Sequence, residues 1–451
     1  MKKTISILMV LVLTLAVFTG CAKKSEPAPA PAEAPATKAE VKAEPEAKKI
    51  DLNGITLQLW HAQSKANGDA MNMVVELFNS TNPYGITVVP TYQGGYGDTH
   101  KKILGGLAAG NYPNVGQAYN NNMMHYLPSG ALMDLTDYFK DDYGISQEDL
   151  ATVEPAYLGE NSAFPDGGMY AVSLGKSTEA FFYNKTFFEE NGLKVPTTFD
   201  ELTEVAAAAS AITGKPSFGL DSTDNWGIYG PMNFGAKYAD VNGNVFLYDE
   251  NNIEATKAFY EWWENGIDNG WFRTAGDDRY CSGPYSSGDL QMFIGSCSGV
   301  NYIKPDGFEF GVALIPVGPE PHVIQQGGNF CGFKTGDEAI DLATSIFLEF
   351  LYTPEAGALY AANTGYLPAN HAGLQEPVFL DCIAKGGVNG ITKGVCASYP
   401  QEWKTYDPVF AESYDVRKAL ATPLQGIEVT DQSIDELIAD TQKKLAEILG
   451  K

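Results

Sequence analysis

The chain of 451 residues is poor in arginine, with only Arg273, Arg279 and Arg417. Its formal net charge is −26, and because the first 49 residues are net basic, the acidic excess lies entirely after residue 49. No run rich in lysine and arginine occurs after that point. Nucleic-acid binding needs a basic stripe on the surface, so we expect no nucleic-acid partner. Solubility is sufficient to explain the acidic charge.

Enzyme and metal signatures are also scarce. No Gly-rich loop ends in Gly-Lys-Ser/Thr, and the five histidines lack metal-ligand spacing. "GSCSG" places Cys297 at the centre of the spacing of a nucleophile elbow, which would require a downstream Asp and His. "DVNGN", at 240–244, fits an Asn-Gly hairpin turn better than a calcium loop. We expect no enzymatic activity, metal or cofactor. The alternative is a secreted glycan-acting enzyme, which would need two facing carboxylates.

The chain contains one apolar run that precedes a cysteine and a low-complexity segment. Residues 5–18 are almost wholly apolar and follow two lysines, but they are too few for a membrane-spanning helix, so we predict a signal peptide over 1–20. "FTGC", at 18–21, resembles the lipobox of bacterial lipoproteins, in which the cysteine is acylated and becomes the mature N-terminus. This resemblance makes Cys21 the lipidation site. An ordinary secretory signal is the alternative.

Residues 22–49 consist almost entirely of Ala, Pro, Glu and Lys and contain no aromatic side chain. Such a segment buries too little apolar surface to offset the entropy of ordering. We therefore expect 21–49 to be an acylated, disordered linker that holds the rest of the chain near a membrane.

Five further cysteines follow Cys21, so at least one is unpaired within the chain. Cys382 and Cys396 flank the Gly-rich stretch "IAKGGVNGITKGV" and are the predicted disulfide pair. Buried free thiols are the alternative.

Strand and helix patterns alternate after residue 50. "ITLQLW" alternates like a strand, Asp69 is expected to cap a helix with apolar residues at helical spacing, and "ITVVPTY" is a second strand. Similar patterns recur, through a strand at 308–318 and paired helices at 337–365 that restart at Thr353-Pro354, to a terminal helix at 431–451. Strand, helix and strand in this order predict an α/β fold with a parallel sheet. The length suffices for two lobes.

Aromatic side chains gather where predicted strands end, which is where parallel-sheet proteins bind ligands. Aromatic faces pack against the C–H faces of sugars, while nearby amides and hydroxyls bond the sugar hydroxyls. "YNNNMMHY" adds three consecutive amides to this set. The pattern favours a carbohydrate ligand. The aromatic residues are Trp60, Tyr92, Tyr96, Tyr119, Tyr183, Trp226 and Tyr366.

The segments "LQLWHAQ", "ELFNSTNPYGITVVPTYQGGY", "FYNKTFFEENGL", "FGVALIPVG", "QQGGNF" and "NTGYLPAN" resemble family 1 extracellular solute-binding proteins, the sugar-type binding subunits of ABC importers. The likeness spans 53–451 and is strongest to the glycerol-3-phosphate-binding group. It implies a periplasmic-binding-protein-like fold of two α/β lobes, with three crossings between them and a ligand cleft. Lobe one is expected at 50–175 and 313–333, and lobe two at 176–312 and 334–451.

The resemblance and the aromatic pattern together give a set of expected ligand-binding residues. In the glycerol-3-phosphate-binding group an arginine binds the phosphate, whereas Arg417 aligns several residues past that place and only Lys176 could replace it. A neutral mono- or oligosaccharide is therefore expected, with glycerol-3-phosphate or another phosphorylated or polyol ligand as the alternative. The expected set is Trp60, His61, Tyr92, Tyr96, Tyr119, Asn120, Lys176, Ser177, Trp226, Ser296, Ser298, Gly327, Gly328 and Tyr366.

The implied function is capture of a carbohydrate by hinge closure and its delivery to the permease subunits of an ABC importer. We expect an exported monomer, held on a bacterial membrane by the acyl chain and facing the periplasm or the cell surface. A receptor that reports its ligand to a sensor protein is the alternative.

If Cys21 carries the anchor, Cys21→Ser should move the protein from the detergent phase to the aqueous phase in a detergent partition. The wild type should show the mass of an acyl chain on its N-terminal peptide. A Cys21→Ser protein that stays equally membrane-bound would contradict the lipoprotein prediction.

Overall fold

The computed structural model describes residues 50–140 and 143–450. The predicted signal peptide over 1–20, the lipidation site Cys21 and the linker over 21–49 lie outside the described residues. In the part of the chain that the structure describes, no helix is both long and apolar enough to cross a membrane.

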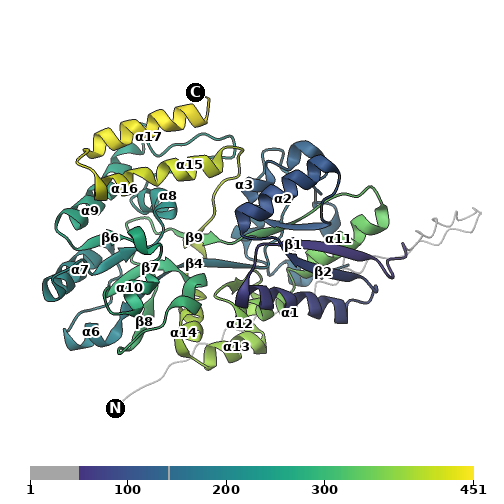
Figure 1. Cartoon of the computed structure of the whole chain (residues 1–451), viewed down its shortest axis with the longest axis horizontal. Helices are drawn as coiled ribbons and strands as arrows, with labels where there is room; N and C mark the ends of the chain where they lie inside the picture. Colours follow the sequence, from purple (N-terminus) through teal and green to yellow (C-terminus); the bar gives the residue numbers. More distant parts are fainter. Residues whose placement is uncertain (1–49, 141–142, 451) are drawn as a thin grey trace, which may run out of the picture. The chain divides into compact units, whose positions relative to one another are not determined.

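The first of two sheets has the strand order β10-β3-β1-β2 (Figure 1). β1, β2 and β3 are parallel, and β10 is antiparallel to β3. Helix α1 connects β1 to β2, which confirms the predicted strand-helix-strand unit. The bounds are β1 (Thr56–His61), α1 (Lys65–Thr81), β2 (Thr87–Tyr92), α2 (Tyr96–Ala109), β3 (Val115–Ala118), α3 (Asn120–Met123), α4 (Gln147–Leu150), α5 (Pro155–Asn161) and β10 (Asn329–Gly332).

Helix α1 begins five residues earlier than expected. Asp69 lies inside α1, and Ser64 occupies the N-cap position with extended backbone geometry. The apolar periodicity through Met71, Val74, Val75 and Phe78 is as predicted, and all four side chains are buried. The prediction that Asp69 caps the helix was therefore wrong, whereas the predicted buried face of α1 is confirmed.

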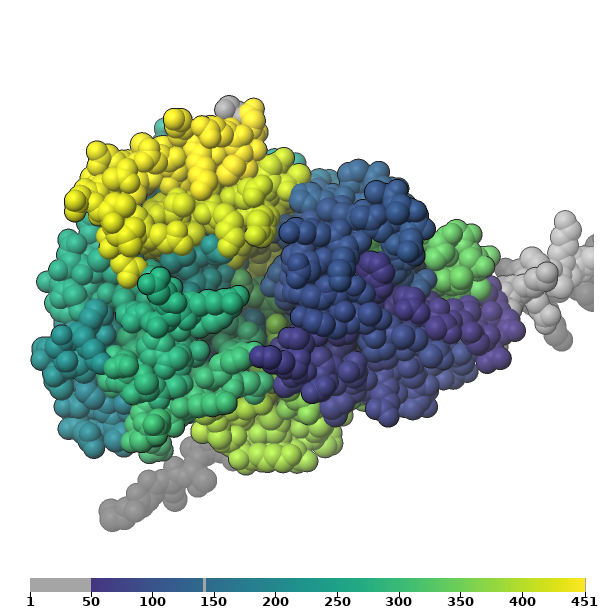
Figure 2. All heavy atoms as spheres, viewed as in Figure 1, coloured from purple at the N-terminus to yellow at the C-terminus, as the bar shows by residue number. Residues whose placement is uncertain are grey.

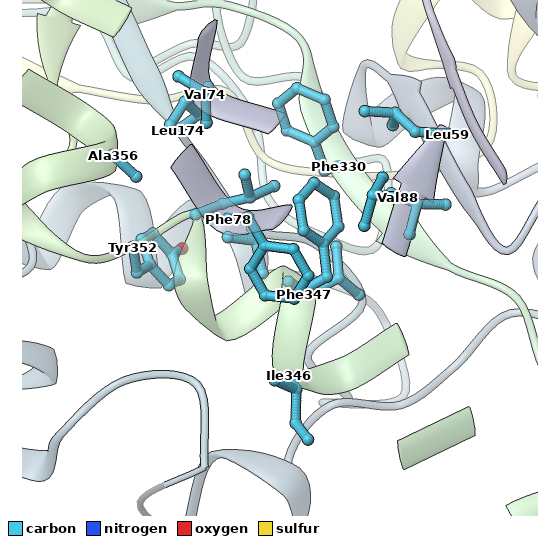
Figure 3. Packing of buried hydrophobic residues seen from close by; sticks show 14 of the residues in the cluster. Leu59, Val74, Phe78, Val88, Leu174, Phe330, Ile346, Phe347, Tyr352 and Ala356 are labelled. Carbon is cyan, nitrogen blue, oxygen red and sulfur yellow. The ribbon is translucent and has the colours of Figure 1, made fainter. Parts of the chain in front are cut away.

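Helices α11 (Glu338–Phe350) and α12 (Pro354–Asn363) pack in the same apolar core as β1 and α1. Figure 3 shows Phe347 of α11 against Phe78 of α1, and their ring centroids are 5.0 Å apart. Thr353 caps α12 as the sequence predicted. The expected division placed 334–451 in lobe two, but these two helices cover the first sheet.

The second sheet has the order β12-β9-β4-β7-β5-β6, and β8 and β11 also pair with β4. β4 runs antiparallel to β7, β8, β9 and β11, while β5 is parallel to β6 and β7. The strand bounds are β4 (Gly175–Asn184), β5 (Phe218–Leu220), β6 (Phe272–Thr274), β7 (Met292–Ser296), β8 (Phe310–Ala313), β9 (Val323–Gln326), β11 (Leu367–Pro368) and β12 (Lys404–Thr405).

The helices of this part of the chain pack in several apolar clusters: α6, α7, α8, α9, α16 and α17 contribute to a second core around Phe181, Phe218 and Trp263, α10, α13 and α14 to a third cluster, and α15 to a further one. Their bounds are α6 (Lys185–Glu190), α7 (Phe199–Thr213), α8 (Thr223–Asn233), α9 (Ile253–Asp268), α10 (Ser282–Ser286), α13 (Pro377–Ala384), α14 (Gly387–Cys396), α15 (Ser413–Leu420), α16 (Thr422–Val429) and α17 (Ile434–Ile448). Short 3-10 helices lie at η1 (Leu127–Ser129), η2 (Tyr138–Lys140), η3 (Gly276–Asp278), η4 (Cys297–Tyr302), η5 (Ala372–Gln375) and η6 (Gln401–Trp403).

The chain passes between the two sheets at positions that differ in part from the expected crossings. Val172 bridges Phe330 of the first sheet, and β4 of the second sheet begins at Gly175. β9 pairs with β4 of the second sheet, although 313–333 was expected in lobe one. The passage back to the first sheet therefore falls at Gly327-Gly328, between β9 and β10, and not near Val312.

Candidate functional site

A pocket of about 320 Å³ is lined by residues that adjoin both sheets. Helix α3, after β3, contacts α15 of the C-terminal region. In Figure 2 the blue residues of the first sheet's region meet the yellow-green residues of the C-terminal helices. The lining residues are Tyr119, Asn120, Asn121, Glu160, Ser222, Asp224, Asn225, Ile324, Gln325, Gln326, Gly327, Asp407, Pro408, Val409, Ser413, Tyr414, Arg417 and Lys418.

On the first-sheet side, the amides that follow β3 differ in their bonding. Asn120 is saturated: its Nδ2 donates to the Glu160 carbonyl at 2.9 Å and to Asn161 Oδ1 at 3.1 Å. Its Oδ1 accepts from Asn329 Nδ2 at 2.7 Å. The next residue, Asn121, has a buried Oδ1 without a hydrogen-bond partner among the described residues. A buried acceptor without a partner is costly, so Asn121 Oδ1 marks a place in the pocket where a hydrogen-bond donor could be accommodated.

On the opposite side, Asn225 joins three elements. Its Nδ2 donates to Glu179 Oε1 at 2.6 Å and to Gln326 Oε1 at 3.0 Å. Its Oδ1 accepts from Gln326 Nε2 and from Arg417 Nη2, each at 2.6 Å. Ser222 caps α8 and so holds Asn225 in the helix's first turn. This network fixes the pocket wall formed by α8, β9 and α15.

The cations at the pocket are paired with carboxylates. Arg417 pairs with Asp407, and Lys418 pairs with Asp224. Behind the wall, Lys176 is completely buried and pairs with Glu160. Lys176 Nζ also donates to the Gly327 carbonyl at 3.2 Å. The lining therefore offers no unpaired cation among the described residues.

Glu179 lies beneath Asn225 and has an unusual acidity. Burial raises the pKa of its carboxyl to about 7, with a smaller contribution from Asp221 and opposing contributions from the Asn225 hydrogen bond and Arg417. Near neutral pH a large fraction of Glu179 is thus protonated and neutral.

The structure brings three of the predicted tyrosines together. The rings of Tyr96 and Tyr119 have centroids 4.6 Å apart, and Tyr366 lies close to Tyr96. Tyr96 Oη accepts from Gln63 Nε2 at 2.8 Å and from the Gly328 amide at 3.3 Å. Burial raises the pKa of Tyr96 and Tyr366 well above its usual value. Tyr119 reaches the pocket lining, with the other two hydroxyphenyl groups beside it.

Two glycines of the predicted set shape the passage between the sheets. Gly327 has φ 147° and lines the pocket. A Cβ on Gly328 would lie 2.3 Å from the ring of Tyr96, so this position requires glycine.

The three predicted serines are hydrogen-bonded within the protein. Ser177 Oγ donates to the Gln326 carbonyl at 3.3 Å, and the hydroxyls of Ser296 and Ser298 bond each other at 2.9 Å.

Of the fourteen predicted residues, only Tyr119, Asn120 and Gly327 line the pocket. The other eleven do not, and they include the four described next. Trp226 is 2% exposed and packs between Phe199 and Phe259 in the second core. Trp60 packs against an apolar cluster on the far side of β1 from Leu59. The remaining two are His61, which is buried with its pKa lowered to about 4 by burial, and the exposed Tyr92.

The nucleophile-elbow spacing around Cys297 does not assemble a catalytic set. Its Sγ accepts from the Thr178 amide at 3.3 Å, and a 3-10 helix follows it. The downstream histidines are engaged elsewhere: His322 Nδ1 bonds Thr405 Oγ1, and His371 Nε2 lies 3.1 Å from Glu154.

Several pocket residues were missed by the sequence reasoning. Arg417 was expected to lie outside the site, but its guanidinium lines it. The scarcity of arginine was the one signal that could have drawn attention to it. The other missed residues bear ordinary polar side chains without a local pattern: Glu160, Ser222, Asp224, Asn225, Gln325, Gln326, Asp407, Ser413, Tyr414 and Lys418.

A polar pocket walled by elements of two α/β sheets defines a class of binding protein that holds a small solute between two lobes. Residues 74–380 match the family model of the bacterial extracellular solute-binding protein family. The chain belongs to this family.

Curated relatives and solved structures agree with this placement. The chain is 25% identical over 331 residues to the sn-glycerol-3-phosphate-binding periplasmic protein UgpB of Escherichia coli (strain K12), covering 70% of this chain and 75% of the relative. The cyclic alpha-maltosyl-1,6-maltose binding protein from Arthrobacter globiformis has a TM-score of 0.73 at 20% identity, covering 88% of this chain and 99% of that one.

UgpB from Mycobacterium tuberculosis, solved in complex with glycerophosphocholine, has a TM-score of 0.73 at 21% identity, covering 88% of this chain and 98% of that one. These likenesses confirm the predicted periplasmic-binding-protein fold.

The pKa of Glu179 predicts a pH-dependent stability. The folded state holds the Glu179 proton more tightly than the unfolded state does. Protonated Glu179 therefore adds about 3 kcal/mol to the free energy of unfolding, and this stabilisation is complete below pH about 4.5 and is lost as pH rises through about 7. Glu179→Gln keeps the acceptor for Asn225 and has no proton to lose. Its melting temperature should rise relative to wild type between pH 5 and pH 8, while the exposed control Glu148→Gln should follow wild type. Parallel curves for wild type and Glu179→Gln would refute this assignment.

Proposed function

We propose that this protein is the substrate-binding subunit of an ABC importer that captures a neutral mono- or oligosaccharide. The observation that carries the proposal is a pair of unpartnered polar atoms in the pocket: the buried Asn121 Oδ1 and the buried Ser413 Oγ. A sugar hydroxyl can donate to the first and accept from the second. The face of Tyr119 supplies apolar area for a sugar ring.

The charge pattern of the pocket supports a neutral ligand. Arg417, Lys418 and Lys176 each pair with one carboxylate, so the site is locally balanced. A phosphate dianion would have to displace Asp407 from Arg417 before it could use that guanidinium. The cost of separating a part-buried pair opposes this exchange.

One observation favours the phosphorylated or polyol alternative as a second candidate. Arg417 lines the pocket, and a guanidinium fork matches a phosphate group geometrically. Relatives named for glycerol-3-phosphate and a structural neighbour solved with glycerophosphocholine point in the same direction.

Ligand contact with both walls would favour the closed form by differential binding, and the permease would recognise that form. The expected ligand roles of Trp60, His61, Tyr92 and Trp226 remain predictions, as do the acyl anchor on Cys21, the monomeric state and the sensor alternative.

Calorimetry with neutral maltose-type sugars, glycerol-3-phosphate and glycerophosphocholine should rank a neutral sugar first, at least tenfold tighter, or about 1.4 kcal/mol. Its affinity should change little between low and high salt, because no ion pair forms on binding. Arg417→Gln and the control Lys418→Gln test the alternative. If glycerol-3-phosphate binds tenfold tighter and loses that margin only in Arg417→Gln, the neutral-sugar proposal fails.

The unpartnered Oδ1 of Asn121 gives a second, independent test of the proposal. With the best neutral ligand from the ranking, Asn121→Ala should weaken binding by roughly 2- to 12-fold, the worth of one hydrogen bond of about 0.5–1.5 kcal/mol. Asn122→Ala is the matched control, because Asn122 lies on the same helix outside the lining, and its affinity should equal that of wild type. Equal losses in the two variants would show that Asn121 does not contact the ligand.

A further inference from the structure

The described residues contain five cysteines, all present as free thiols. The predicted Cys382–Cys396 disulfide is therefore absent from the structure. The two cysteines that lie together are instead Cys297 and Cys396, which belong to the same apolar cluster and sit on the packed helices η4 and α14. Cys281 and Cys331 have no cysteine as a recorded partner and lie in separate surroundings, beside Asp221 and Gly116 respectively.

The surroundings of the Cys297–Cys396 pair hold the two sulfurs in place. Helix η4, which begins at Cys297, packs against α14, which ends at Cys396. Both residues are 1% exposed and belong to one apolar cluster. The Thr178 amide of strand β4 donates to Cys297 Sγ at 3.3 Å, and this hydrogen bond helps to hold the Cys297 thiol in place.

We propose that Cys297 and Cys396 form a disulfide during folding after export. The family is extracellular, and disulfides form and persist in such compartments. The oxidant is a disulfide-bearing thiol oxidant, either a small molecule or a protein. One cysteine thiolate attacks a sulfur of that disulfide and expels one thiolate, which leaves a mixed disulfide. The second cysteine thiolate attacks the protein sulfur of the mixed disulfide and expels the other, so two protein thiols are oxidised and one external disulfide is reduced to two thiols.

The bond has a structural consequence at the end of β7. Cys297 lies between Ser296 and Ser298, in the turn against which Gly365 packs so closely that a Cβ there would meet the Cys297 carbonyl at 2.4 Å. A covalent link to α14 would hold this turn beside the segment that carries Tyr366. It would also close a loop of about 100 residues, which constrains the unfolded chain strongly.

The test uses the full chain, exported to an oxidising compartment and purified without reductant. The protein is unfolded in guanidinium with an alkylating agent, digested and mapped by mass spectrometry. Cys281, Cys331 and Cys382 should be alkylated, and a cross-linked peptide containing Cys297 and Cys396 should appear, two hydrogens lighter than its separate halves. Alkylation of both Cys297 and Cys396 without reductant, or a cross-link from Cys382 to Cys396, would overturn the proposal.

Thermal unfolding provides a second readout. Reductant should lower the melting temperature of the wild type by a few degrees, and Cys396→Ala should abolish this response. Cys331→Ala is the matched control, because it removes an equally buried thiol from another apolar cluster, and it should keep the response to reductant. A reductant response that survives in Cys396→Ala would also overturn the proposal.

Discussion

A lysine ammonium without access to water sets the geometry of the junction between the two sheets. Lys176 lies at the start of β4, and an unpaired charge there would cost several kcal/mol. It is neutralised by Glu160 on α5, and it also donates a hydrogen bond to the Gly327 carbonyl. One cation therefore ties together both passages of the chain between the sheets and places Glu160 and Gly327 in the pocket wall.

A buried polar network extends from this junction and leaves only a few atoms for a ligand. Asn161 Nδ2 donates to Ser173 Oγ at 2.9 Å and to Tyr352 Oη at 2.7 Å, and Ser173 Oγ donates to Asn329 Oδ1 at 2.8 Å. Fully bonded buried networks are rigid, whereas an unbonded member is costly. Asn120 is satisfied in this network, whereas the buried Asn121 Oδ1 and Ser413 Oγ have no hydrogen-bond partner among the described residues, and our proposal assigns both to the ligand.

The features that were predicted correctly from the sequence are those that depend on residue spacing along a short stretch of chain. The strand-helix-strand unit and the helix restart at Thr353 follow from spacing within a few residues, so both were correct. The amphipathic pattern of 338–350 shows that this helix has an apolar face, but it cannot show which sheet that face covers. Likewise, adjacent side chains on a helix point about 100° apart. Asn225 therefore lines the pocket, whereas Trp226 packs in the second core. The Arg417–Asn225 bond joins residues 192 positions apart, and no local pattern records it.

The contrast between the chain's overall charge and its pocket argues for the ligand class. A net charge of −26 repels anions at long range, but salt screens that field over about 8 Å at physiological ionic strength. Selectivity must therefore come from groups that touch the ligand. There, each acid in the lining is matched by a cation, and the buried carboxyl beneath Asn225 has its pKa raised to about 7, which removes much of one further negative charge. This balance supports the proposal of a neutral ligand, because a site whose charges are paired gains little from a charged ligand, whereas hydroxyl-rich solutes can be held by hydrogen bonds and shape.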